Sequence, residues 1–261
     1  MDDPSAPVPE PVAPGPVTHE SRLLRVATFN IHHGRVGAHW PCLPWRLRAG
    51  IRLLDADLIA LQEVDRRVVR SWFVDLAELA RQAARAGAVT FARARWFGPG
   101  GQYGNALVSR GTIGAVDVVH LPVGGGREPR LAIVARAEVA GERVVVVSTH
   151  LQTKRSEAIE QLHFLVARLA EEQGPVLLCG DFNLHPDDVA PIVAAGGFEL
   201  AGGANSSGVD HPWHRIDHIA VRGGTILAVD VPRPPVSDHR PVIATVRVAG
   251  RSAAPSVCSG P

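Results

Sequence analysis

Four stretches of the chain share one pattern, an apolar run that ends abruptly in polar side chains. They are RVATFN at 25–30, DLIALQE at 57–63, RVVVVSTH at 143–150 and VLLCGDFN at 176–183. Apolar runs of this length predict buried strands, and polar residues at the carboxyl ends of such strands are typical of ligand sites. For any single run, the polar residues could simply mark where the strand leaves the core. Four such endings, of types suited to a hard cation or to proton transfer, favour one shared site.

Hydrophobic periodicity predicts the other elements. Helices are expected at 44–54, 75–86 and 156–171, where apolar residues recur every three or four positions, and a short one within 185–197. Ser156 is expected to cap the third helix. Strands are expected at 22–30, 57–63, 89–93, 105–109, 116–120, 130–138, 143–151, 216–221, 226–231 and 241–248. Ala140-Gly141-Glu142 predicts a hairpin turn, 65–70 a charged loop and 97–104 a glycine-rich turn.

The order of these elements favours an α/β fold with two sheets. Strands outnumber helices, and hairpin-like pairs alternate with single helices. Two sheets packed face to face, with helices outside, satisfy this order. A doubly wound sheet is disfavoured, because it would need a helix after nearly every strand.

The chain of 261 residues, 46% of them hydrophobic, is long enough to bury the core of one domain. This domain is expected over 21–249. Residues 1–20, which are acidic and Pro-rich, and residues 250–261 are expected to be disordered tails. The N-terminus lacks the basic and apolar regions of a secretory signal, and no run of 18 apolar residues predicts a transmembrane helix. We therefore expect a cytoplasmic protein and a monomer, and the sequence implies no protein partner.

Charge is unevenly distributed although the formal net charge is only +1. Residues 21–95 hold 13 Arg against six acidic residues. This segment could be a set of solvated helix faces or a rim that attracts a phosphate-bearing substrate. The three cysteines are widely spaced and predict neither a disulfide framework nor a zinc site.

The candidate chemistry lies at the strand ends and in two later segments, RIDHI at 215–219 and SDHRP at 237–241. The polar candidates are Asn30, Glu63, His150, Asp181, Asn183, Asp217, Asp238 and His239. Carboxylate and amide oxygens suit Mg²⁺, and a histidine backed by a carboxylate stays protonated more readily. Gly180 is expected to leave room for a ligand to approach. The motifs of serine hydrolases, zinc peptidases and P-loop nucleotide hydrolases are absent.

Seven motifs in one order resemble the endonuclease/exonuclease/phosphatase family, which includes DNase I and exonuclease III-type enzymes. They are TFNIHHG at 28–34, ALQEVD at 60–65, YGNALVSR at 103–110, STHL at 148–151, GDFN at 180–183, RIDHI at 215–219 and SDHRPV at 237–242. The resemblance implies a four-layered α/β/β/α sandwich, with two mixed sheets and one active site at the sheet ends. It also implies a metal-dependent phosphoesterase in which activated water attacks the phosphorus directly.

The resemblance assigns a role to each candidate. Mg²⁺, with Mn²⁺ as a substitute, would be held by Asn30 and Glu63, with Asp238 nearby. Asp181 would orient or deprotonate the attacking water, and Asn183 would help to place it. His239 would bind the phosphoryl oxygens with its ring fixed by Asp217, and His150 would add a second contact. The phosphate pocket would be lined by Tyr103, Asn105 and Arg130.

Two features leave alternatives open. RIDHI carries His218 where an aromatic residue is usual in the family, which is expected to alter the shape of the pocket. Together with His211 and His214 it could hold a second metal, although a polar loop is the simpler interpretation. The histidines His32, His33 and His39 are interpreted as surface or supporting residues.

The motifs bind phosphate and do not identify the rest of the substrate. Nucleic acid, DNA or RNA, is the leading hypothesis because of the Arg-rich segment. The alternatives are a phospholipid or a small-molecule phosphate, either a diester or a monoester. A catalytically inactive binding module on the same fold is a more remote hypothesis, because the metal and acid residues are all present.

Overall fold

The computed structural model describes residues 23–36, 41–124, 127–208 and 214–248, so both predicted tails, His39 and His211 lie outside the described residues. The helices are α1 (Pro44–Leu54), α2 (Leu76–Ala83), α3 (Arg155–Leu169) and α4 (Pro186–Ala195), with short 3₁₀ turns η1 (His32–Gly34) and η2 (Val69–Ser71). The strands are β1 (Leu23–Asn30), β2 (Leu58–Arg66), β3 (Ala88–Trp96), β4 (Gln102–Ser109), β5 (Thr112–His120), β6 (Leu131–Val139), β7 (Glu142–His150), β8 (Val176–Asp181), β9 (Glu199–Leu200), β10 (Asp217–Arg222), β11 (Gly224–Asp230) and β12 (Val242–Val248).

These strands form two sheets of similar design. One sheet has the order β11-β12-β1-β2-β4-β3, and the other has the order β5-β6-β7-β8-β10-β9. Each sheet has one parallel pair, β1 with β2 and β7 with β8. A parallel pair needs a crossover between its strands, and α1 and α3 lie in these two crossovers. The carboxyl ends of each parallel pair therefore lie at the same edge of their sheet.

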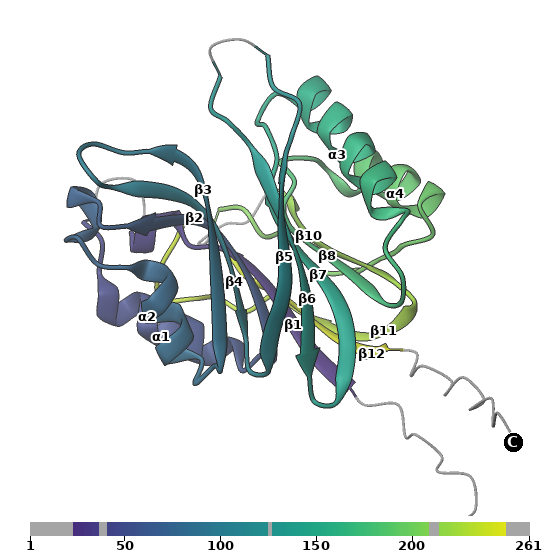
Figure 1. The fold of residues 1–261 in the computed structure, drawn as a ribbon, viewed down its shortest axis with the longest axis horizontal. Coiled ribbons are helices and arrows are strands. Elements are labelled where there is room, and N and C mark those ends of the chain that lie inside the picture. The colour runs from purple at the N-terminus through teal and green to yellow at the C-terminus, as the bar shows by residue number, and fades with distance from the viewer. Residues whose placement is uncertain (1–22, 37–40, 125–126, 209–213, 249–261) are drawn as a thin grey trace, which may run out of the picture.

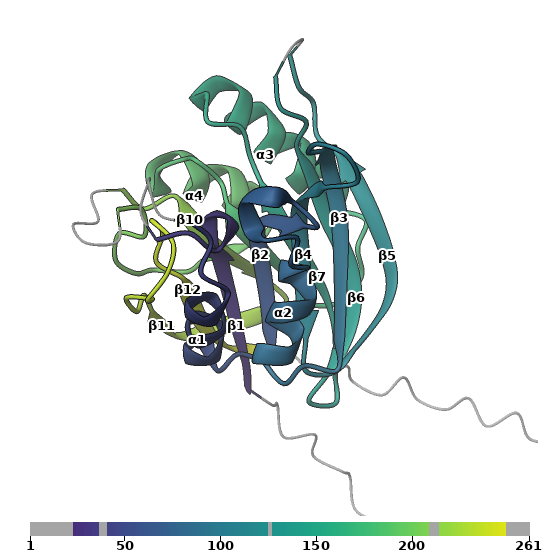
Figure 2. The same ribbon diagram turned by 90° about the vertical axis from the view of Figure 1, so that its left-hand side faces the viewer.

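Three hydrophobic clusters separate four layers. One cluster lies between the sheets, a second between the first sheet and α1 and α2, and a third between the second sheet and α3 and α4. In Figure 1, α1 and α2 lie on one side of the strands and α3 and α4 on the other. Figure 2 looks onto the layer of α1 and α2. The predicted α/β/β/α sandwich is confirmed. No helix in the described part of the chain is both long and apolar enough to cross a membrane.

Most predicted elements are present, and the differences have local causes. The hairpin between β6 and β7 is confirmed: Ala140 and Gly141 have φ of 53° and 84°, as a tight two-residue turn requires. β2 continues to Arg66, beyond the predicted end, because it pairs with β4 as far as Gln102. The predicted cap by Ser156 is wrong, because α3 begins at Arg155 after Lys154 and has no side-chain cap.

The interpretation of Gly180 is also corrected. A Cβ atom at this position would collide with the backbone and side chain of Thr149 in the neighbouring strand β7. The glycine therefore makes room for another strand of the sheet and not for a ligand.

Candidate active site

The alternation of side chains along the strands directs the polar strand ends into one place. In β8, Leu177 and Cys179 pack between the sheets, so Asp181 points the same way. In β1, Leu24 and Val26 have that orientation, and Asn30 continues it. The same parity applies to β7, where Val144 and Val146 precede His150. The strand ends therefore deliver polar groups to the space between the two sheets.

Pairing between strands aligns three of these residues. His150 of β7 and Asp217 of β10 are both register partners of Asp181 in β8. Because β10 is antiparallel to β8, its first residue lies beside the last residue of β8. A residue far along the chain thereby joins the row, as the sequence resemblance predicts.

Glu63 reaches the site through a β-bulge. Between Leu61 and Val64 the pairing of β2 with β4 shifts, so that Gln62 and Glu63 together face only Asn105. Leu61 and Val64 both pack against the helix layer, and Glu63 has φ of 56°. Without the extra residue, Glu63 would follow Leu61 onto the helix face. The bulge turns its carboxylate toward Asn30.

Asp181 lies at the centre of the site. Its Oδ2 accepts a hydrogen bond from Asn30 Nδ2 at 3.0 Å and lies 3.5 Å from His150 Nε2 and 3.9 Å from His239 Nε2. Its Oδ1 accepts from the backbone N–H of Asn183 at 3.0 Å. Burial, followed by the nearby charge of Asp217, raises the pKa of Asp181 to about 7. This carboxyl group is therefore tuned to exchange a proton near neutral pH.

His239 is held as a cation. Its Nδ1 donates to Asp217 Oδ2 at 2.8 Å, and Asp217 is completely buried. Burial opposes a charge on the ring, but the carboxylates of Asp217, Asp181 and Asp238 outweigh it and raise the pKa of His239 to about 10. Its backbone N–H donates to Ser237 Oγ, and that hydroxyl donates to Asn30 O at 2.7 Å. The loop before β12 is thereby tied to the end of β1.

His150 is neutral. Arg130 Nη1 donates to His150 Nδ1 at 3.2 Å, and arginine has no acceptor, so the ring proton lies on Nε2, which faces Asp181. Burial and then the charge of Arg130 lower the pKa of His150 well below its ordinary value. Arg130 is in turn paired with Glu128 at 3.0 Å. The two histidines therefore offer different chemistry, one as a cation and the other as a neutral donor.

Three other predicted site residues, Asn183, Asn105 and Tyr103, make contacts with the surrounding fold. Asn183 Nδ2 donates to Leu151 O, and Asn105 Nδ2 donates to Leu131 O. The ring of Tyr103 is 6% exposed and lies 5.5 Å from the ring of His33. These contacts hold the three side chains in place.

A candidate metal centre lies beside this row. His32, His33 and Glu63 place ligand atoms within 4.8 Å of one another. His32 Nδ1 is buried, forms no hydrogen bond to the described residues and lies 3.1 Å from Asp238 Oδ1. Asn30 directs its amide nitrogen at Glu63 Oε1, and its oxygen accepts from the backbone N–H of His32. The carboxylates of Glu63 and Asp238 beside these imidazole nitrogens fit a divalent cation.

Several supporting residues were not predicted. Ser206 Oγ accepts the backbone N–H of Asp217, and Ser237 ties His239 to β1. The serine two residues before a histidine is the one signal that could have revealed such a turn. His218 does not face the site: its Nε2 contacts Leu184 O at 2.8 Å on the helix side of β10. His218 therefore does not shape the pocket directly, contrary to the expectation from its place in RIDHI.

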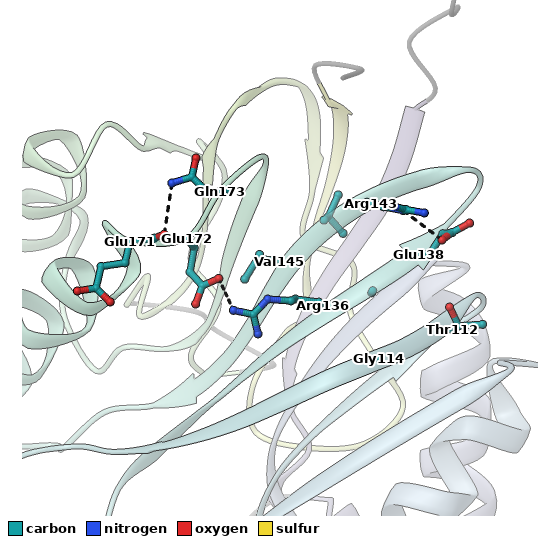
Figure 3. A pocket seen from close by; sticks show the side chains of 11 residues that line it. Thr112, Gly114, Arg136, Glu138, Arg143, Val145, Glu171, Glu172 and Gln173 are labelled. Carbon is teal, nitrogen blue, oxygen red and sulfur yellow. Dashed lines mark hydrogen bonds and ion pairs between the residues drawn. The ribbon is translucent and has the colours of Figure 1, made fainter. Parts of the chain in front are cut away.

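A cavity of about 460 Å³ lies at the opposite end of the second sheet (Figure 3). It is lined by residues at the start of β7, among them Arg143 and Val145, and by Glu172 after α3. Its charged side chains pair with one another, for example Arg136 with Glu172 at 2.7 Å. Because these charged groups pair with one another, they do not converge on one point as the polar groups around Asp181 do.

Comparisons with known proteins bear on the family and the fold. The model of the Endonuclease/Exonuclease/phosphatase family matches residues 27–239. A solved structure of an endonuclease/exonuclease/phosphatase from Beutenbergia cavernae has a TM-score of 0.74 and 24% identity over 89% of this chain and 73% of that chain. A mannosyl-6-phosphatase from Bacteroides thetaiotaomicron has a TM-score of 0.67 and 15% identity over 85% and 99%.

The catalytic domain of human Nocturnin, solved with bound sulfate, has a TM-score of 0.63 and 19% identity over 86% of this chain and 94% of that one. No curated protein sequence matches the chain. At these identities the solved structures establish the fold, whereas the family model spans most of the sequence, including all the strand ends described above. The chain therefore belongs to the endonuclease/exonuclease/phosphatase family of phosphoric ester hydrolases.

Proposed function

We propose that the protein is a divalent-metal-dependent phosphodiesterase in which Asp181 directs a water molecule at a phosphate group held by His239 and His150. One observation carries this proposal. The Asp181 carboxylate lies within 4 Å of ring nitrogens of two histidines that differ in charge. A base, a cation and a neutral donor thus converge on one point, as hydrolysis of a phosphoester requires.

Asp181 is the candidate base. Asn30 and the backbone of Asn183 each hold one of its oxygens, so the carboxylate has a fixed orientation. Water placed at Oδ2 would lose its proton to a group whose pKa is already near neutrality. Asn183, whose backbone makes one of these bonds, is proposed to help place the water and the phosphate.

His239 and His150 are the candidate phosphate ligands. The imidazolium of His239 would bind a non-bridging oxygen and counter the charge that develops during attack, and Asp217 keeps this ring protonated and oriented. His150 would donate a hydrogen bond from its Nε2–H group to a second oxygen. Arg130 fixes the tautomer that makes this donation possible. Tyr103 and Asn105 are proposed to line the same pocket.

Glu63 is the proposed anchor of the metal, with Asn30 and Asp238 as further ligands; His32 Nδ1, which lies 3.1 Å from Asp238 Oδ1, fits the same role. A bound Mg²⁺ or Mn²⁺ would polarise the phosphoryl oxygens and stabilise the leaving oxygen. Hydrolysis should then require added Mg²⁺ or Mn²⁺ and stop when EDTA removes it.

Nucleic acid is the proposed substrate. Beside Tyr103, the hairpin of β3 and β4 exposes a series of guanidinium groups stacked on aromatic rings. Arg93 lies 3.9 Å from the ring centre of Trp96, which is 58% exposed, and Arg95 lies 5.4 Å from that of Tyr103. Such pairs can stack with bases and attract phosphates.

A small-molecule phosphate is the second candidate. It is favoured by the structural likeness to the mannosyl-6-phosphatase. In this chain, Glu128 lies 3.5 Å from Arg95 and 3.0 Å from Arg130, so it neutralises part of the positive rim. A small substrate needs the phosphate site but not a long basic groove.

The test uses supercoiled plasmid, intact or carrying abasic sites, with Mg²⁺ and an Asp181→Ala control. The proposal predicts nicking by the wild-type protein that disappears in the control. Nicking confined to abasic plasmid would narrow the substrate to damaged DNA. If neither plasmid is nicked while a chromogenic phosphodiester is cleaved, the site assignment stands and the small-molecule alternative replaces nucleic acid.

A further inference from the structure

A buried acid lies behind the metal candidate Glu63. Asp65 is two residues further along β2 and is completely buried. Both of its oxygens accept from Arg70, one from Nε and the other from Nη2, each at 2.8 Å. A two-pronged bond of this kind fixes the guanidinium plane as well as its position.

Arg70 passes this orientation on to His33. The same Nη2 atom lies 3.0 Å from His33 Nδ1, and His33 Nε2 lies 3.0 Å from Glu63 Oε2. Arginine only donates, so Nδ1 must accept, and the carboxylate only accepts, so Nε2 must carry the proton. The neutral Nε2–H tautomer is the one form that satisfies both contacts. This tautomer leaves two acceptors near Nδ1 without a proton, the Glu63 carbonyl oxygen at 3.2 Å and Asp65 Oδ1 at 3.6 Å.

We propose that Asp65, Arg70 and His33 form a positioning chain that fixes the Glu63 carboxylate for the cation. The inference rests on the proposed function, because it assigns to Glu63 the role of metal anchor. All three are therefore positioning residues. They act through Glu63, whose other oxygen, Oε1, accepts from Asn30 at 3.1 Å.

The order of charges in the positioning chain suits the task of orienting Glu63 without neutralising it. An arginine placed directly on Glu63 would neutralise the carboxylate and weaken its attraction for a cation. Here Asp65 balances Arg70, and a neutral ring separates the pair from Glu63, so orientation is passed on while the negative charge is kept.

Aromatic rings pack against two members of the positioning chain, Arg70 and His33. Arg70 lies 4.1 Å from the ring centre of Phe97 in the turn between β3 and β4, and the ring of Tyr103 lies 5.5 Å from that of His33. The backbone of His33 has φ of 54°, an uncommon conformation for a residue with a side chain. This local strain turns the imidazole inward from η1, where it is 7% exposed.

The protein offers a matched control outside the positioning chain. Arg66 also lies after Glu63, donates through Nε to a carboxylate, Asp75 Oδ2, at 2.7 Å, and lies 4.9 Å from the ring centre of Phe91. Its side chain is 35% exposed, compared with 28% for Arg70. Arg66 thus has the same kind of contacts as Arg70 but none with His33.

The experiment measures Mn²⁺ binding to the full chain by electron paramagnetic resonance, with the melting temperature of each variant recorded. Arg70→Gln should weaken Mn²⁺ binding about ten-fold or more, as loss of an outer-shell partner does, whereas Arg66→Gln should leave it unchanged. A purely structural role would lower the melting temperature of both variants and leave the affinity of the folded protein unaltered.

A second pair of variants covers the case in which Arg70→Gln does not fold. His33→Ala should weaken Mn²⁺ binding to the same extent, and His33→Gln should restore it, because an amide can accept from Arg70 and donate to Glu63. Wild-type affinity in His33→Ala, or in a folded Arg70→Gln, would overturn the positioning chain. Failure of the proposed function would look different, since the wild-type protein itself would then bind no Mn²⁺ or hydrolyse no phosphoester.

Discussion

The charge of His239 depends on Asp217, and replacing this carboxylate with an amide tests the dependence directly. His239 Nδ1 donates to Asp217 Oδ2 at 2.8 Å, in a site where Asp217 is fully buried and His239 is 9% exposed. Burial opposes the charge of the ring, and the carboxylates, Asp217 foremost, raise the pKa of His239 to about 10. Asp217→Asn keeps an acceptor for the ring and removes the largest favourable charge.

The expected change can be estimated from this geometry. Loss of a buried charge in direct contact should lower the His239 pKa by about 2 to 3 pH units, to roughly 7 to 8. The imidazolium is the form that binds phosphate, so turnover is present below the pKa and is lost as pH rises through it. At about pH 9 most of the wild-type protein stays protonated, whereas the variant retains roughly a tenth or less, which predicts a ten- to hundred-fold difference in kcat/KM.

The assay is a pH profile of kcat/KM on a chromogenic phosphodiester, together with the titration of His239 followed by NMR. The two proteins should approach one another near pH 6 and diverge above it. Asp75→Asn is the control, because Asp75 caps α2 and pairs with Arg66 and does not contact His239. If the variant and the wild-type protein lose activity over the same pH range and His239 titrates alike in both, then Asp217 does not keep His239 protonated.

Three further predictions concern the base, the metal and the core. Asp181→Asn should lower turnover by about a thousand-fold, because an amide cannot take a proton from the attacking water; wild-type turnover would contradict the role of the base. Glu63→Gln should raise the Mg²⁺ concentration needed for half-maximal turnover by about ten-fold or more, measured by metal titration, and an unchanged titration would contradict the metal assignment. Phe29→Ala should lower the free energy of unfolding in urea by about 3 to 5 kcal/mol, because this ring is completely buried against α1 and α2. Phe73→Ala, at a ring that is 64% exposed, is its control and should change that free energy by less than about 0.5 kcal/mol.

The sequence predicted the strand ends because two simple regularities act there. Side chains alternate along a strand, and parallel strands place their carboxyl ends at one edge of a sheet. Asn30, His150 and Asp181 follow from these regularities alone. Asp217 and His239 come from segments without such a pattern, and only the resemblance to a family joined them to the site.

Other features depend on geometry that the sequence does not carry. The bulge that redirects Glu63 needs knowledge of the register with β4, and DLIALQE reads as an uninterrupted strand. The contact of Arg70 with His33 joins residues 37 positions apart, and HHG gives no sign that the second histidine turns inward. The length of β2 was underestimated because charged residues after Glu63 resemble a loop, while pairing with β4 keeps them in the sheet. In each case, tertiary contacts outweighed local preference.

The residues around Asp181 are proposed to hydrolyse a phosphoester with the help of a divalent cation. The most direct measurement is the rate at which purified protein cleaves a chromogenic phosphodiester with Mg²⁺, with Mg²⁺ plus excess EDTA, and as the folded Asp181→Asn variant. Turnover is expected in the first case and should be lost in the other two. Turnover that persists in the Asp181→Asn variant, or that is unaffected by EDTA, would contradict this mechanism.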